Sequence, residues 1–233
     1  MTEDLVAANR ILVNEGVLDA YGHVSMRHPA NPARYRMGRN LAPALVTAAD
    51  IVEYDLDSHP VGAPANFGHF FERFIHGEIY RARPDVNAVV HSHSPAVIPF
   101  SVTERPMRPL YHMASFLHPG VPVFEIRQAG GMTDMLIGNP ALGRALAKTL
   151  ADKNVALMRG HGNVVVADTL PMAVFRAVYT EVNARLQMQA IALGGPINFL
   201  AAEEGEKAMR VLENTHLRAW NIWKRTALDN DAR

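Results

Sequence analysis

Arg83-Pro84-Asp85-Val86-Asn87-Ala88-Val89-Val90-His91-Ser92-His93 joins a predicted strand to a pair of histidines. Residues 86–90 are a mostly apolar, β-branched run typical of a buried strand, and Pro84 ends a helix predicted over residues 70–83. His91 and His93 lie immediately beyond this run. Because side chains two residues apart in extended backbone point to the same side, we expect both imidazoles to face one space. The segment therefore predicts a chelating pair at a strand end.

Outward from this segment, strand and helix patterns follow one another along the chain without a repeat, low-complexity tract or linker. Residues 24–27 and 35–37 predict a hairpin, and Thr47-Ala48-Ala49-Asp50 has the spacing of a capping box. Asn139-Pro140 is a helix cap followed by proline at the first helical position. Other strands are predicted over residues 51–56, 121–124, 155–158 and 164–166, and other helices over residues 5–18 with Thr2 as N-cap, 140–152, and 171 to about 193. These elements predict one layered α/β unit.

The C-terminal segment predicts one further amphipathic helix with an apolar face that belongs to the core. That face carries Met209, Leu212, His216, Trp220 and Trp223. Two other features are interpreted as structural only: Gly130-Gly131 as a turn, and Arg27, Arg36 and Arg39 as a solvated surface.

Composition excludes several classes of protein. The chain has 233 residues, 48% of them hydrophobic, which suffices for one well-buried core. Lys+Arg and Asp+Glu both number 23, so bulk electrostatics recruit neither nucleic acid nor an anionic membrane. The first residues lack the pattern of a secretory signal, and no apolar run reaches the roughly 18 residues of a membrane helix, so a cytoplasmic protein is expected.

Histidine and carboxylate are the strong metal ligands that this chain offers, because it contains no cysteine. His161 lies between two predicted strands, and Gly160 and Gly162 on either side permit close approach of a ligand. It is a candidate third imidazole for an open metal site. Glu72, on the helix before the histidine pair, is placed to ligate an ion or to exchange protons with a substrate. From spacing alone, a hydrogen-bonded structural role for these histidines stays open.

Four segments together resemble the class II aldolase/adducin family, and the resemblance extends over roughly residues 5 to 195. They are Gly22-His23-Val24-Ser25-Met26-Arg27, Glu72-Arg73-Phe74-Ile75-His76, the segment from Arg83 to His93, and Gly160-His161-Gly162. The resemblance implies a three-layer α/β/α sandwich around a largely antiparallel sheet, with residues 1–233 as a single domain that ends in a helical tail. It also implies one divalent ion per subunit, zinc or manganese, held by His91, His93 and His161, with Glu72 as the catalytic acid/base group.

The same resemblance implies a homotetramer with active sites at subunit boundaries. In the sugar-phosphate aldolases of this family a tyrosine assists catalysis, and its place by spacing falls on His112. His112 is therefore a candidate catalytic residue that reaches a neighbouring subunit's site.

Phosphate-binding positions of the family depart from the sugar-phosphate pattern in this chain. His23 occupies the turn, residues 41–46 are apolar, and Phe70 and Phe71 precede Glu72 where hydroxyl donors are expected. An apolar wall favours a planar ring over a phosphate dianion. We predict His23, Phe70 and Phe71 as substrate-binding residues. Arg127 is a candidate for binding a carboxylate that remains on the product, with a surface salt bridge as its alternative.

These variants resemble the decarboxylase branch of the family, which acts on hydroxylated aromatic or pyridine carboxylates such as 3-hydroxy-2-methylpyridine-4,5-dicarboxylate. Decarboxylation and aldol cleavage both leave an electron pair on carbon, and a metal beside a conjugated oxygen stabilises it in either reaction. A metal-dependent decarboxylase, a carbon-carbon lyase acting on a small carboxylate, is the leading prediction. An aldolase or epimerase acting on a sugar (phosphate) and a non-catalytic adducin-like structural protein are the alternatives.

Overall fold

The computed structural model describes residues 1–64 and 66–229, and an eight-stranded sheet forms its centre. The strand order is β4-β3-β2-β1-β5-β8-β7-β6, and all neighbouring pairs are antiparallel except β6 with β7. Both edge strands are only two residues long. The strands are β1 (His23–Arg27), β2 (Arg34–Gly38), β3 (Ile51–Asp55), β4 (Pro60–Val61), β5 (Ala88–Ser92), β6 (Val123–Phe124), β7 (Val155–Met158) and β8 (Gly162–Ala167). The prediction of a largely antiparallel sheet is confirmed.

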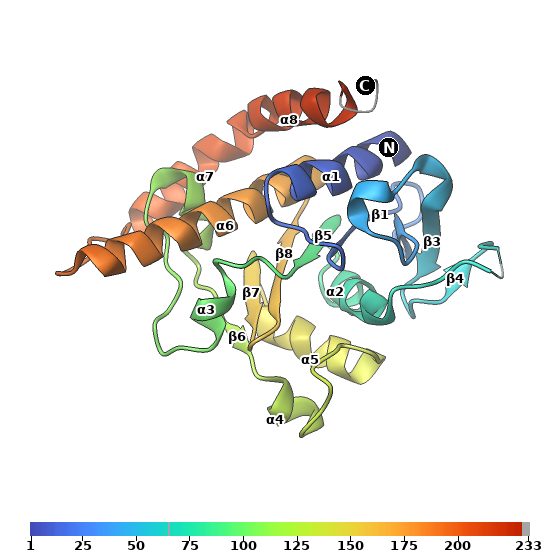
Figure 1. Ribbon diagram of the computed structural model, residues 1–233, viewed down its shortest axis with the longest axis horizontal. Coiled ribbons are helices and arrows are strands. Elements are labelled where there is room, and N and C mark those ends of the chain that lie inside the picture. The colour runs from blue at the N-terminus through green and yellow to red at the C-terminus, as the bar shows by residue number, and fades with distance from the viewer. Residues whose placement is uncertain (65, 230–233) are drawn as a thin grey trace.

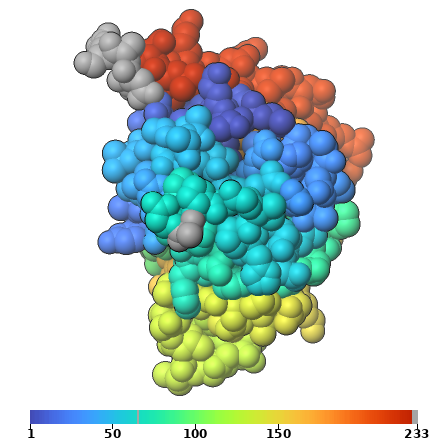
Figure 2. Space-filling view, turned by 90° about the vertical axis from the view of Figure 1, so that its right-hand side faces the viewer, coloured from blue at the N-terminus to red at the C-terminus, as the bar shows by residue number. Residues whose placement is uncertain are grey.

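Helices cover both faces of this sheet, as Figure 1 shows, so the predicted three-layer sandwich is confirmed. One face is covered by α1 (Thr2–Asn14) and α6 (Leu170–Leu193); α8 (Leu217–Asp229) packs against both of these helices, and α7 (Ala202–Thr215) packs against residues 112–117. The other face packs against α2 (Phe74–Ala82) and α5 (Pro140–Leu150). Shorter helices lie in the connections: η1 (Pro43–Leu45), η2 (Ala48–Asp50), η3 (Phe71–Arg73), α3 (Ile98–Ser101), η4 (His112–Leu117) and α4 (Ile126–Gly130). Figure 2 shows the layers stacked, with α8 in red at one end and α4 and α5 in yellow at the other.

The central strand β5 is buried on both faces. Ala88 and Val90 belong to the core beneath α6, whereas Val89 belongs to the core beneath α2 and α5. This double burial explains why the sequence shows a nearly continuous apolar run there rather than an alternating one. The strand begins two residues later than predicted and contains His91 and Ser92, so the expectation that both histidines lie beyond it is wrong for His91.

Two predicted helix starts are confirmed by their capping contacts. The Asn139 side chain accepts a hydrogen bond from the Leu142 amide, and the capping box between Thr47 and Asp50 is present. The first helix differs from its prediction. Thr2 is its first residue rather than its N-cap, and the helix ends at Asn14 because Gly16 adopts a φ of 71° that turns the chain. Among the described residues, no helix combines the length and hydrophobicity needed to cross a membrane.

The C-terminal tail forms two helices, not the single helix predicted. The break lies at His216, whose Nδ1 is 3.0 Å from the carbonyl oxygen of Glu213 near the end of α7. Leu212 and Trp220 are buried in the core beneath α6, so the prediction that this face belongs to the core is confirmed.

Arg27 is only 8% exposed, and its prediction as part of a solvated surface is wrong. Its guanidinium donates to the carbonyl oxygens of Pro32, Tyr80, Arg83 and Val86 at 2.7–2.9 Å. Arg27 therefore ties the hairpin, α2 and the start of β5 together. The other two arginines of that prediction are partly exposed and pair with acidic groups, Arg36 with Glu53 and Arg39 with Asp50.

Candidate metal centre

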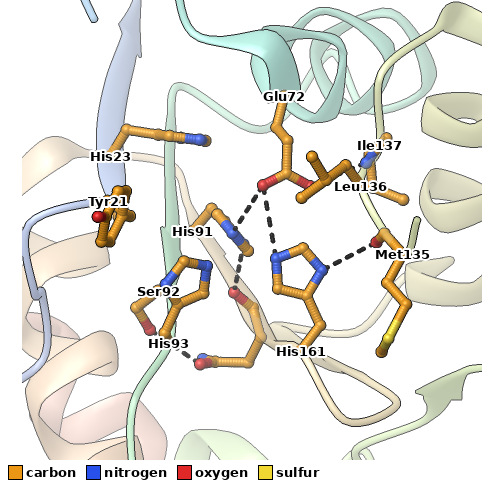
Figure 3. A network of polar contacts seen from close by, with 12 residues as sticks. Tyr21, His23, Glu72, His91, Ser92, His93, Met135, Leu136, Ile137 and His161 are labelled. Atoms are coloured by element: carbon orange, nitrogen blue, oxygen red, sulfur yellow. Dashed lines mark hydrogen bonds and ion pairs between the residues drawn. The ribbon is translucent and has the colours of Figure 1, made fainter.

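Three histidines and one carboxylate meet at the end of β5, as Figure 3 shows. His91 is inside β5, His93 follows the strand, and His161 lies in the turn between β7 and β8. Glu72 reaches the same point from η3. One ligand atom of each residue lies within 4.8 Å of the others. The structure thus brings together all four residues that the sequence selected for a metal site.

The Nδ1 atoms of all three histidines face oxygen acceptors on the outside of the cluster. His91 Nδ1 lies 3.2 Å from the Asn163 carbonyl oxygen, and His161 Nδ1 lies 3.1 Å from the Met135 carbonyl oxygen. His93 Nδ1 lies 3.2 Å from Asp19 Oδ2. Because an oxygen acceptor holds the proton on Nδ1, the lone pair of each imidazole is left on Nε2, the form that ligates a metal.

His91 Nε2 is buried and has no hydrogen-bond partner among the described residues. Glu72 Oε2 is the nearest carboxylate oxygen, at 3.6 Å from His91 Nε2 and 3.4 Å from His161 Nε2. A buried nitrogen lone pair facing a carboxylate at this distance leaves room for a cation between them. The donor set, imidazole nitrogens with one carboxylate, fits Zn²⁺ or Mn²⁺.

The protonation of His91 and Glu72 suits a metal, whereas burial lowers the pKa of His161 but the contact with Glu72 outweighs it and raises that pKa. Burial lowers the pKa of His91 to about 3, so this imidazole is neutral. Burial by itself raises the pKa of Glu72, but the contacts with His161 and His91 and the hydrogen bond from the Ile137 amide outweigh it and lower that pKa to about 2. Neutral imidazole and ionised carboxylate are the forms that bind a divalent ion.

Glu72 has non-helical angles, φ −88° and ψ 17°, so the predicted helix over residues 70–83 is divided into η3 and α2. Its Oε1 accepts a hydrogen bond of 2.9 Å from the Ile137 amide, which leaves Oε2 directed at the histidines. The kink therefore orients the carboxylate toward the metal site.

The model of the class II aldolase and adducin N-terminal domain matches residues 3–188. This chain belongs to the class II aldolase and adducin family. The decarboxylase tropJ of Talaromyces stipitatus is 37% identical, over 94% of this chain and 91% of that protein. A 3,4-dihydroxyphthalate decarboxylase of Arthrobacter keyseri is 31% identical, over 85% of this chain and 82% of that protein.

Solved structures of the family share the fold. The L-fuculose 1-phosphate aldolase from Glaciozyma antarctica superimposes with a TM-score of 0.81 at 23% identity, covering 100% of this chain and 90% of that one. An aldolase II superfamily protein from Pseudomonas syringae also gives 0.81, covering 98% of this chain and 92% of that one. At this identity the likeness concerns the fold alone.

Two of the predicted substrate-binding residues lie beside the candidate metal centre of this family member. His23 is 3% exposed, and its ring centroid is 5.0 Å from that of His91 and 4.7 Å from that of Phe70. Phe71 differs from its neighbour because it is 54% exposed and packs against Gly138. Phe70 and His23 therefore form the wall next to the histidines, with Phe71 at the edge.

The other two predicted residues lie apart from the histidine cluster within this chain. Arg127 makes a bidentate ion pair with Glu125, which also binds Arg159, so its guanidinium forms the surface salt bridge named as the alternative. His112 begins η4, is exposed, and has its one described ring contact with Tyr111. A role in a neighbouring subunit stays a prediction.

Sequence reasoning missed the groups that orient the histidines. Asp19 accepts hydrogen bonds from the Tyr21 and Gly22 amides and also faces His93. An aspartate three residues before glycine is a signal for such a turn, and it could have been used. The backbone carbonyls of Met135 and Asn163 could not be predicted from the sequence, because every residue has a backbone carbonyl.

Proposed function

We propose that this protein is a divalent-metal-dependent decarboxylase of a hydroxylated aromatic or pyridine carboxylate. The observation that carries the proposal is the convergence of three Nε2 lone pairs and the Glu72 carboxylate on one point. The decarboxylases among its relatives support the reaction class. The aromatic ring of Phe70, which packs against His23 next to His91, supports a planar substrate.

His91, His93 and His161 would hold the ion through Nε2. A Zn²⁺ or Mn²⁺ ion in that position supplies a Lewis acid next to the oxygen of a bound substrate. The protein itself contributes the orientation of the imidazoles, through Asp19 and the Asn163 and Met135 carbonyls.

Glu72 carries the proton in this proposal. Its Oε2 takes the proton of the ring hydroxyl and delivers it to the ring carbon that bears the carboxylate, which makes the ring ketone-like. The bond between that carbon and the carboxylate then breaks, carbon dioxide leaves, and the electron pair restores the aromatic ring with the negative charge on the ring oxygen. The product oxygen takes a proton from water. One carboxylate is thus replaced by one proton, and Glu72 returns to its ionised form.

The test separates the two lyase reactions. Protein reloaded with Zn²⁺ or Mn²⁺ is incubated with 3,4-dihydroxyphthalate, 3-hydroxy-2-methylpyridine-4,5-dicarboxylate and L-fuculose 1-phosphate, and carbon dioxide and aldehyde are followed separately. We expect carbon dioxide from at least one ring acid. Aldehyde from the sugar phosphate without carbon dioxide from either acid would favour the aldolase alternative.

Variants connect the activity to the cluster. His91→Ala is expected to abolish both metal binding and carbon dioxide release, because it removes one of three imidazoles. His28→Ala is the matched control, since His28 belongs to neither group of described residues that could hold a metal ion. Equal metal content in wild type and His91→Ala would contradict the assignment.

We also propose a homotetramer with His112 near a neighbouring subunit's site. Light scattering coupled to size exclusion measures the mass directly. An active monomer would contradict this assembly.

A further inference from the structure

A continuous chain of buried polar side chains lies behind His23. His23 Nδ1 is 2.6 Å from His76 Nε2, and His76 Nδ1 is 2.6 Å from Ser25 Oγ. Ser25 Oγ is in turn 2.8 Å from the Tyr80 hydroxyl. The four residues come from β1 and α2, and none of them is more than 3% exposed. We call them the polar chain.

The polar chain has to run in one of two directions. Two ring nitrogens 2.6 Å apart share one proton, so either His76 donates to His23 or His23 donates to His76. Both rings are buried and neither makes an ion pair with a carboxylate among the described residues, so each is neutral and carries a single N–H. The choice at this pair therefore fixes the direction of every other hydrogen bond along the chain.

The Tyr80 end decides between the directions. Ser25 Oγ is the one hydrogen-bond partner of the Tyr80 hydroxyl among the described residues. If the chain ran toward Tyr80, the phenolic O–H would have no acceptor among the described residues. Leaving a fully buried hydroxyl donor unpaired costs about 1–3 kcal/mol. In the other direction, Tyr80 donates to Ser25, Ser25 to His76, and His76 to His23, so every donor between Tyr80 and His76 is paired and only the His23 N–H at the far end is left without a partner.

The direction of the polar chain also decides which ring nitrogen of His23 carries the proton. Because His23 Nδ1 accepts from His76, its single proton lies on Nε2. This atom has no hydrogen-bond partner among the described residues, and the ring stands beside His91 and Phe70. In Figure 3 the imidazole extends from β1 toward the space next to Glu72.

We propose that His76, Ser25 and Tyr80 are positioning residues that hold His23 as an Nε2–H donor, and that this donor binds a carboxylate oxygen of the substrate. The binding part rests on the proposed decarboxylase function. The opposite tautomer would present a lone pair to that anion and repel it. The polar chain thus makes His23 present an N–H, with its partial positive charge, to a substrate carboxylate instead of a lone pair.

The tautomer is tested directly by nitrogen NMR of metal-free protein labelled with ¹⁵N-histidine. The His23 signals are assigned by their loss in His23→Gln. We expect a protonated Nε2 and an unprotonated Nδ1. A proton on Nδ1 would overturn the proposal, whatever the enzyme's activity.

Ser25→Ala is the variant that perturbs the polar chain without touching His23. It removes the donor to His76, so His23 should become a mixture of tautomers. Ser115→Ala is the matched control, because Ser115 is equally buried and its Oγ has no hydrogen-bond partner among the described residues. A wild-type His23 pattern in Ser25→Ala would mean that the chain does not set the tautomer.

Binding is tested with salicylate as the probe, which should shift the His23 Nε2 signal. An unshifted signal at saturating salicylate would overturn the donor role.

Steady-state kinetics test the same role with any ring acid that the enzyme decarboxylates. Ser25→Ala should raise KM about tenfold, which corresponds to the loss of one charge-assisted hydrogen bond, with a smaller change in kcat. Equal KM values in wild type and Ser25→Ala would also contradict the donor role of His23. If no ring acid is turned over, the proposed function fails, whereas the NMR and salicylate results still decide the polar chain.

Discussion

Gly162 packs against the backbone of Ser92 and His93, and Gly162→Ala tests whether the candidate metal site depends on this close contact. A methyl group on Gly162 would stand 2.0 Å from the Ser92 carbonyl oxygen and 3.3 Å from the His93 Cα. Both neighbours are backbone, so no side chain can rotate away. Reaching even the 3.0 Å limit of real contacts requires the segments to separate by about 1 Å.

That displacement acts on His93 and His161 together, because each adjoins the clash. Metal-to-nitrogen distances tolerate only about 0.2 Å, so we expect metal affinity to fall at least about tenfold. Overpacking should also lower the free energy of unfolding by about 1–3 kcal/mol.

Isothermal titration of stripped protein with Zn²⁺ measures the affinity, and urea denaturation measures the stability. Gly68→Ala serves as the control, since a methyl group there meets its nearest neighbour at an ordinary 3.5 Å. If Gly162→Ala bound Zn²⁺ like wild type, the close approach of the two segments would have no role in holding the site.

Three further results are expected. Glu72→Gln should keep much of the metal, because the three imidazoles remain and the amide oxygen can still accept from Ile137, while the decarboxylation rate measured by carbon dioxide release falls about 100-fold or more. Arg27→Met should lower the free energy of unfolding, measured by urea denaturation, by about 2–4 kcal/mol, because buried carbonyls lose their donor. An unchanged free energy of unfolding would mean that Arg27 does not hold the hairpin, α2 and the start of β5 together. Hydrogen bonds from Thr47 and contact with Arg39 hold the pKa of Asp50 at about 2, below its unfolded value of 3.8. Its contribution is therefore present above about pH 4 and lost as pH falls through 2, so the stability difference between wild type and Asp50→Asn should shrink on acidification.

The sequence predicted those parts of the fold that depend on local pattern. The apolar run before His91, the cap at Asn139 and the glycines around His161 each act on their own neighbours, and the structure has the corresponding strand, helix and turn. Strand periodicity also sufficed to bring His91 and His93 to one point.

Features that depend on distant partners were not predictable in the same way. Glu72 leaves the helical conformation where it receives the amide of Ile137, 65 residues away in the chain. Arg27 looked like a surface residue because its acceptors are backbone carbonyls from other segments. The tail break at His216 likewise lies within an uninterrupted amphipathic pattern. In each case a backbone group, invisible in residue type, decides the outcome.

The brevity of the two edge strands limits how copies of this protein can associate. β4 has two residues, one of them Pro60, which has no N–H to donate, and β6 also has only two. Neither edge offers the row of unpaired backbone groups that another strand would need. Neither edge therefore supports continuation of the sheet from one copy into another. The same brevity protects the chain from open-ended, fibre-like growth.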